Sequence, residues 1–230
     1  MDERVLQGDP DIALTLRRSA RARRITLRIS QLDGRVTLTL PHRVSERDAL
    51  AFAAEKRDWI ARHLASRPQE NIVGLGSTLP LEGQVCTLVQ GAGRGIRLEG
   101  ARLIVPGRAD TAARRTLGFL KARARDQLAL QSDVYSDRLG VGYSSITIRD
   151  TRSRWGSCSS EGRLMYSWRL ILAPPEVLNY VAAHEVAHLA QMNHSPAFWA
   201  EVERIHGPYK AVRRWLKTEG NALHQYRFGD

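Results

Sequence analysis

Three histidines and one glutamate lie close together in the segment AAHEVAHLAQMNHSPAFW, residues 182–199, of a chain that has seven histidines in all. On a helix, His184 and His188 project from one face, because residues four apart are neighbours there. Glu185 is rotated by about 100° from His184, so its carboxylate can reach a water molecule without being a metal ligand. The pattern predicts a zinc (Zn²⁺) site that activates water, with the Glu185 carboxylate within reach of that water.

A hydrolytic zinc site needs a third protein ligand and one position left open for water. His194 is the expected third ligand, provided that the helix ends before it and the chain turns back. Asn193 tolerates the left-handed backbone that such a turn can need, and the Ser-Pro pair at 195–196 is a favourable start for the next helix. Some zinc hydrolases use a glutamate from a following helix, so Glu201 and Glu203 remain alternatives to His194.

The elements around this motif can be predicted from periodicity. The motif helix is expected to begin at the Pro-Pro pair 174–175, because proline is favourable in a first helical turn. Two strand-like runs, at 146–149 and 164–172, precede it and flank a polar connection that contains a glycine. A longer helical pattern covers 111–139 and stops at Gly140. We therefore expect the motif on a helix that follows two strands.

The N-terminal part is expected to be rich in strands. Alternating apolar residues at 25–29 and 36–40 flank an Asp-Gly pair at 33–34, which is typical of a β-hairpin. A helix is expected over 45–64, and short antiparallel strands over 73–108.

Together these patterns predict an α+β fold. Its β-rich N-terminal half is residues 1–110, and residues 111–230 form the half that carries the His-Glu-x-x-His helix; the two halves can pack as one unit. At 230 residues the chain is long enough to bury a sizeable core without disulfides or structural metals.

Composition indicates an ordinary globular protein, with 43% hydrophobic and 26% charged residues. No apolar run approaches the roughly 20 residues of a membrane span, so we expect no membrane association. The N-terminal segment MDERVLQGDPDIALTL has acids and a proline where a secretory signal needs a basic start and an apolar stretch. We expect a cytoplasmic protein whose two cysteines, Cys86 and Cys158, are reduced thiols.

The chain is strongly basic, with 35 Lys and Arg against 24 Asp and Glu and a net charge of +11. This balance favours anionic partners such as nucleotides or nucleic acid, although it is also common on plain solvated surfaces. The densest run of charge has arginines at 17, 18, 21, 23, 24 and 28, with no acid between Asp11 and Asp33. It is either a phosphate-binding strip or the polar face of an exposed hairpin, and few aromatic residues are present to stack on bases.

Three stretches, TRSRWGSC, RLMYSWRLILAPP and HEVAHLAQMNHSPAFW, resemble the YgjP-like (WELM-type) zinc metallopeptidase family, and more distantly SprT-like proteins. The resemblance extends over residues 17–228 and is most specific over 149–199. It implies a zincin-like C-terminal half in which the residues matching His184, His188 and His194 hold zinc. It also implies that Glu185 is the general base and that the substrate is a peptide or protein.

Other residues near the motif are candidates for supporting roles. The polar connection RSRWGSCSS has a composition suited to lining a cleft, and its cleft candidates are Arg152, Arg154, Trp155 and Ser157. A hairpin turn with Trp155 packed in the core is the alternative interpretation. The oxyanion stabiliser is left open between these arginines and Tyr166, Tyr180 and Tyr209.

The sequence leaves three functions open. The first is a zinc-dependent metallopeptidase. The second keeps the metal and changes the substrate, as in a nucleotide phosphohydrolase such as a pyrophosphatase, in which arginines bind the phosphates. The third is a nonenzymatic nucleic-acid-associated protein with a structural metal, although such a site normally has four protein ligands.

Overall fold

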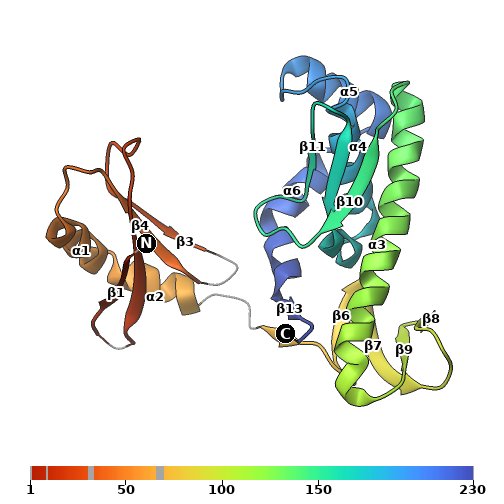
Figure 1. Cartoon of the computed structure of the whole chain (residues 1–230), viewed down its shortest axis with the longest axis horizontal. Helices are drawn as coiled ribbons and strands as arrows, with labels where there is room; N and C mark the ends of the chain where they lie inside the picture. Colours follow the sequence, from red (N-terminus) through yellow and green to blue (C-terminus); the bar gives the residue numbers. More distant parts are fainter. Residues whose placement is uncertain (1, 9, 31–33, 66–69, 230) are drawn as a thin grey trace. The chain divides into compact units, whose positions relative to one another are not determined.

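The computed structural model describes residues 2–8, 10–30, 34–65 and 70–229. The chain forms two compact units, Met1–Gln69 and Glu70–Asp230 (Figure 1). Each unit has a hydrophobic core of its own, which is the property that defines a domain.

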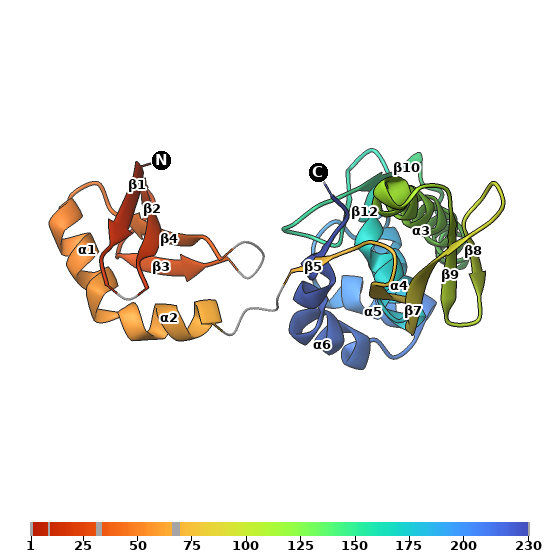
Figure 2. The same ribbon diagram turned by 90° about the horizontal axis from the view of Figure 1, so that it is seen from below.

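The first unit is a four-stranded sheet with two helices on one face (Figure 2). Its strands are β1 (Asp2–Leu6), β2 (Ile12–Arg18), β3 (Thr26–Ile29) and β4 (Val36–Leu40). The strand order is β1-β2-β4-β3, with β2 and β4 parallel and the other pairs antiparallel. Helices α1 (Glu46–Glu55) and α2 (Arg57–Ala65) cover the alternate apolar residues of the sheet.

The predicted hairpin is confirmed, because β3 and β4 pair in antiparallel fashion. Asp33 of its expected turn lies outside the described residues, whereas Gly34 has a left-handed φ of 69°. The helix expected over 45–64 is interrupted at Lys56. The backbone N–H of Lys56 bonds the carbonyl of Ala53, a tighter turn than the α-helix makes, and this separates α1 from α2.

The second unit contains three sheets and one long helix. The first sheet has the order β6-β7-β9-β8 and the strands β6 (Thr78–Leu81), β7 (Gln84–Gly91), β8 (Arg97–Glu99) and β9 (Arg102–Pro106). The second has the order β10-β12-β11 and the strands β10 (Ser145–Arg149), β11 (Gly156–Cys158) and β12 (Arg163–Ser167). The third pairs β5 (Asn71–Ile72) with β13 (Tyr226–Arg227).

Helix α3 (Ala109–Leu139) runs along the second unit and ends at Gly140, as predicted, where φ is 78° (Figure 1). It contacts both the β6–β9 sheet and the later helices of the unit. Neither α3 nor any other helix in the described part of the chain is long and apolar enough to cross a membrane.

The division between the units differs from the expected one between residues 110 and 111. Residues 70–110 belong to the second unit, because the apolar side chains of their sheet are part of its core. Leu88 and Leu103 from this sheet share one buried cluster with Leu120 of α3. The boundary between the two units therefore lies within the expected β-rich half, after Gln69.

The strand expected over 164–172 ends at Ser167, where the side chain of Ser167 accepts a hydrogen bond from the Arg169 backbone N–H. A 3₁₀ segment, η1 (Trp168–Leu172), follows and is entirely buried. A mostly apolar run does not by itself distinguish a strand from another buried element, which explains this error. The chain then continues through the helices α4 (Pro175–Ala187), α5 (Pro196–His206) and α6 (Lys210–Thr218) to η2 (Gly220–Gln225).

Candidate metal centre

The His-Glu-x-x-His motif lies at the C-terminal end of α4, which begins at Pro175 as predicted. This helix is buried on almost every side, in keeping with its apolar sequence. His184 is in its last turn, and His188 is the C-cap residue, with helical φ and ψ of −64° and −20°. The two histidines therefore keep the spacing of one helical turn, although the regular helix ends between them.

The chain reverses between His188 and α5. Asn193 has no left-handed backbone here; instead its side-chain carbonyl accepts a hydrogen bond of 3.1 Å from the Ser195 N–H. Ser195 then caps α5 by accepting from the Phe198 N–H. The expected break and the expected helix start are both confirmed, and the turn returns His194 towards the motif.

The three imidazoles form a cluster in which one potential ligand atom from each residue lies within 4.8 Å of the others. The Nε2 atoms of His184 and His194 are 3.0 Å apart. Their ring centroids are separated by 5.0 Å, and that of His188 lies 5.1 Å from His184 and 4.8 Å from His194. The buried ring of Phe198 contacts all three, with centroid distances of 4.4 to 4.9 Å. The phenyl ring thus forms one wall of the cluster.

The cluster fits a metal ion by its donor chemistry. Zn–N bonds of 2.0–2.1 Å in tetrahedral geometry place two ligand nitrogens about 3.3 Å apart, close to the separation of His184 and His194. Burial, together with His188 and His194, lowers the pKa of His184 to about 3, and burial also lowers the pKa of His188. Both rings are therefore neutral at pH 7, which is the form that binds a metal.

The tautomer of His188 is set by a hydrogen bond to the backbone of another residue. Its Nδ1–H donates a 2.9 Å hydrogen bond to the carbonyl of Gln191, so Nε2 is the nitrogen with a free lone pair. Nδ1 of His184 is buried without a hydrogen-bond partner among the described residues. The ring of His184 is held by aromatic contacts with Tyr180 and Phe198 instead.

Glu185 is buried, with 6% of its surface exposed. Burial raises the pKa of this carboxyl group to about 8, against a smaller lowering effect of Arg154. Its side chain lies against Gly156 of β11: a Cβ at position 156 would be 2.6 Å from both Cγ and Oε1 of Glu185. Glycine is therefore needed at this position for the carboxylate to occupy its place. Sequence reasoning missed Gly156, although a glycine in a short strand is a known sign of close approach.

Glu185 and His184 line a pocket of about 270 Å³ with residues from β11, α4 and α6. The other lining residues are Trp155, Gly156, Tyr180, Val181, Arg213, Leu216 and Lys217. Arg213 and Lys217 were also missed, because nothing in a basic C-terminal helix indicates that two of its residues face a pocket formed by distant segments. They are four apart on α6 and so share one face.

The four predicted cleft residues do not lie together in one cleft. Trp155 lines the pocket, and its ring packs at a tilt of 32° against that of His224, with a centroid distance of 5.1 Å. The positive charge of Arg154 lowers the pKa of Glu185, against the larger effect of burial. Arg152 lines a different hollow, next to Asp150, and Ser157 is half-buried in β11.

The candidates for oxyanion stabiliser and alternative ligand are also placed. Tyr166 is fully buried, and its hydroxyl group is 3.0 Å from that of Ser132, so it belongs to the core. Tyr180 lines the pocket, whereas the ring of Tyr209 is buried between those of Tyr180 and Trp199.

The two glutamates of α5 lie outside the cluster. The carboxylate of Glu201 is paired with Arg204, with a distance of 2.8 Å from Nε to Oε2. Glu203 is exposed to solvent. Among the described residues, only His184, His188 and His194 form a group that can hold a metal ion.

An α+β unit that gathers three imidazoles beside a buried carboxylate has the donor set of a metal-dependent hydrolase. Residues 23–219 match the family described as YgjP-like, metallopeptidase domain, and the chain belongs to this family. Among solved structures, the metallopeptidase zymogen of Pyrococcus abyssi abylysin is similar over 40% of this chain and 95% of that chain, with 24% identity and a TM-score of 0.36. No curated protein gives a significant match.

Proposed function

We propose that this chain is a zinc-dependent metallopeptidase that cleaves peptide bonds in the pocket between α4, α6 and β11. The observation that carries the proposal is the three-imidazole cluster beside buried Glu185. Membership of the YgjP-like metallopeptidase family supports it. The ligands would be His184, His188 and His194.

In this mechanism a zinc ion, when bound, supplies a positive charge that acidifies a water molecule, polarises the substrate carbonyl and favours ionised Glu185. The carboxylate of Glu185 accepts the proton of the attacking water and then delivers it to the nitrogen of the leaving amine. Gly156 leaves room for this carboxylate, and the buried ring of Phe198 restricts the three imidazoles. Tyr180 is our candidate for stabilising the negative charge that develops on the carbonyl oxygen, because its side chain lines the pocket.

The count of ligands argues against a purely structural metal. A structural zinc site closes all four positions with protein groups, but the described residues of the cluster supply three. The fourth position is then left for water or substrate, as a catalytic site requires.

A nucleotide phosphohydrolase is the second candidate function. It is favoured by Arg213 and Lys217, two cations that line the pocket beside Glu185 and suit an anionic group of the substrate. That group is a phosphate in a nucleotide, or a carboxylate in a peptide.

The experiment that tests the proposal uses one zinc-loaded preparation of the full chain. An unstructured protein and a panel of nucleoside triphosphates are offered in parallel, before and after removal of the metal by a chelator. We expect metal-dependent cleavage of the polypeptide that returns when zinc is added back. If only nucleotides were hydrolysed, the phosphohydrolase would be the correct function and the peptidase proposal would be wrong. Hydrolysis that persists after metal removal would refute both candidate functions.

A further inference from the structure

The first unit has a polar sheet face that the proposed function does not use. In β2, β3 and β4 the apolar side chains alternate with polar ones, and the apolar set is packed under α1 and α2. The polar residues therefore lie on the opposite face of the sheet. Strand register places Arg17 and Thr26 on either side of Thr39, and Arg28 directly beside Thr37.

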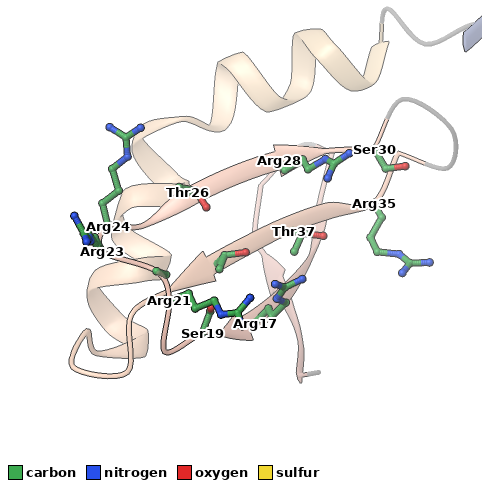
Figure 3. Close-up of a pocket in the computed structure, with 12 residues that line it drawn as sticks. Arg17, Ser19, Arg21, Arg23, Arg24, Thr26, Arg28, Ser30, Arg35 and Thr37 are labelled. Carbon is green, nitrogen blue, oxygen red and sulfur yellow. The ribbon is translucent and has the colours of Figure 1, made fainter. Parts of the chain in front are cut away.

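More arginines from the connections border this face (Figure 3). Together with the strand residues they surround an open hollow of about 960 Å³. Six arginines line it, and no aspartate or glutamate among the described residues does: Arg17, Arg21, Arg23, Arg24, Arg28 and Arg35. Hydroxyl groups of Ser19, Thr26, Ser30, Thr37 and Thr39 are interspersed among them. We name this surface the arginine face.

Five of these six guanidinium groups, all but that of Arg35, have no partner among the residues that the structure describes. In the described part of the chain, Arg17, Arg21, Arg23, Arg24 and Arg28 make no ion pair and no side-chain hydrogen bond. Arg18 differs, because its guanidinium donates to the backbone carbonyls of His42 and Val44. The arginine face thus concentrates positive charge that intramolecular contacts do not neutralise, which is costly unless an anion binds.

Charge density indicates the kind of anion. Arg17 and Arg28 lie on the strands that flank β4, so they are about 10 Å apart across the sheet. A nucleic-acid duplex carries about six negative charges in 10 Å of its axis, at one per 1.7 Å. An extended acidic polypeptide carries about three in the same length, even if every residue is acidic. A duplex therefore presents about twice as much anionic charge per unit length to the arginine face as an acidic polypeptide can, which favours a duplex as its partner.

The other side chains of the arginine face agree with this choice. The described lining of the hollow contains no aromatic residue that could stack on the exposed bases of a single strand. Arginine and hydroxyl groups are instead the donors that proteins use towards phosphate oxygens. We propose that the arginine face binds the phosphate backbone of double-stranded nucleic acid without sequence preference.

The test measures binding of the full chain to a fluorescent DNA duplex of about 20 base pairs by anisotropy, between about 50 and 200 mM salt. The variant Arg17→Gln/Arg28→Gln removes two charges from the arginine face. The matched control, Arg43→Gln/Arg47→Gln, removes two exposed charges of the same unit that lie outside the hollow. We expect the first variant to lower affinity at least tenfold and to flatten the salt slope by about 2, and the control to bind like the wild type.

Further measurements separate this inference from the metal site and from other partners. Circular dichroism of each variant verifies that it is folded, and Glu185→Gln should bind the duplex like the wild type. The proposal is overturned if the wild type does not bind at low salt, or if both double variants lose affinity equally. It is also overturned if polyglutamate or single-stranded DNA of equal length competes better than the unlabelled duplex.

Discussion

Gly156 and Glu185 occupy adjoining space, so that a methyl group on residue 156 would overlap the carboxylate of residue 185. The two residues come from an edge strand and from the motif helix, about thirty positions apart in the sequence. Because the proposed general base depends on this contact, the position of β11 is part of the candidate catalytic machinery. Replacement of this single hydrogen tests the relationship directly.

We predict that Gly156→Ala lowers kcat at least tenfold and leaves the zinc content unchanged, because Glu185 must move while the imidazole cluster does not. Zinc is measured by elemental analysis and kcat with a peptide substrate. Gly142→Ala is the control, since a Cβ there has nothing within 4 Å. Full activity of Gly156→Ala would show that the observed position of Glu185 is not required.

We predict that His194→Ala loses most of the bound zinc, because two imidazoles remain in place of three. Glu201→Ala should keep its zinc, since the Glu201 carboxylate is engaged by Arg204 outside the cluster. Titration with zinc under a competing chelator gives the two affinities. If His194→Ala kept its zinc and Glu201→Ala lost it, the third ligand would be Glu201 and the prediction would be wrong.

We predict that Arg213→Gln/Lys217→Gln raises KM for substrates with an acidic group about tenfold, with little change in kcat. Both cations line the pocket, and each would contribute attraction to the anionic group in the bound state. Lys210→Gln/Arg214→Gln, on the same helix but outside the pocket lining, is the matched control for charge. An equal rise in KM for neutral substrates would contradict a role in recognising anions.

The pH dependence of stability is predicted from His224. Burial, then Arg169, lowers the pKa of its imidazole to about 4, with further lowering by Arg152 and Arg227 and an opposing effect of Asp150. Because the unfolded chain binds this proton at the ordinary value of 6.5, the stabilising contribution is complete above pH 6.5. It is lost as the pH falls towards 4, and amounts to about 3 kcal/mol.

Urea unfolding at several pH values measures this effect, with tryptophan fluorescence as a signal that comes mainly from the second unit, because only Trp59 lies in the first. The variant His224→Gln should lose less stability than the wild type between pH 6.5 and 4. His42→Gln, an exposed histidine of the first unit, is the control and should not alter the profile. A variant profile that parallels the wild type would show that another group is responsible.

Local rules predicted much of the fold. The alternation around 25–40 gave the hairpin, Gly140 marked the end of α3, and the Ser-Pro pair at 195–196 gave the start of α5. These features depend on a few neighbouring residues. Local rules failed at the strand expected over 164–172, because buried elements of different type share the same apolar composition.

The candidate site could be predicted only in part, because some of its residues are neighbours in sequence and others are not. His184, Glu185 and His188 share one helical segment, and a recognisable turn follows it, so local geometry makes the cluster of the three imidazoles predictable. Other residues reach the pocket by tertiary packing, as Gly156 does from β11 and Arg213 from α6. No local sequence pattern predicts that these residues lie at the same pocket.

The most direct test of the account compares zinc content and peptide hydrolysis in wild type and Glu185→Gln. Glutamine preserves the shape of the buried side chain but cannot accept a proton, while the three imidazoles are untouched. The account predicts an equal zinc content, near one per chain, and a fall in kcat of about 10²-fold or more. Undiminished hydrolysis by the zinc-loaded variant would contradict it.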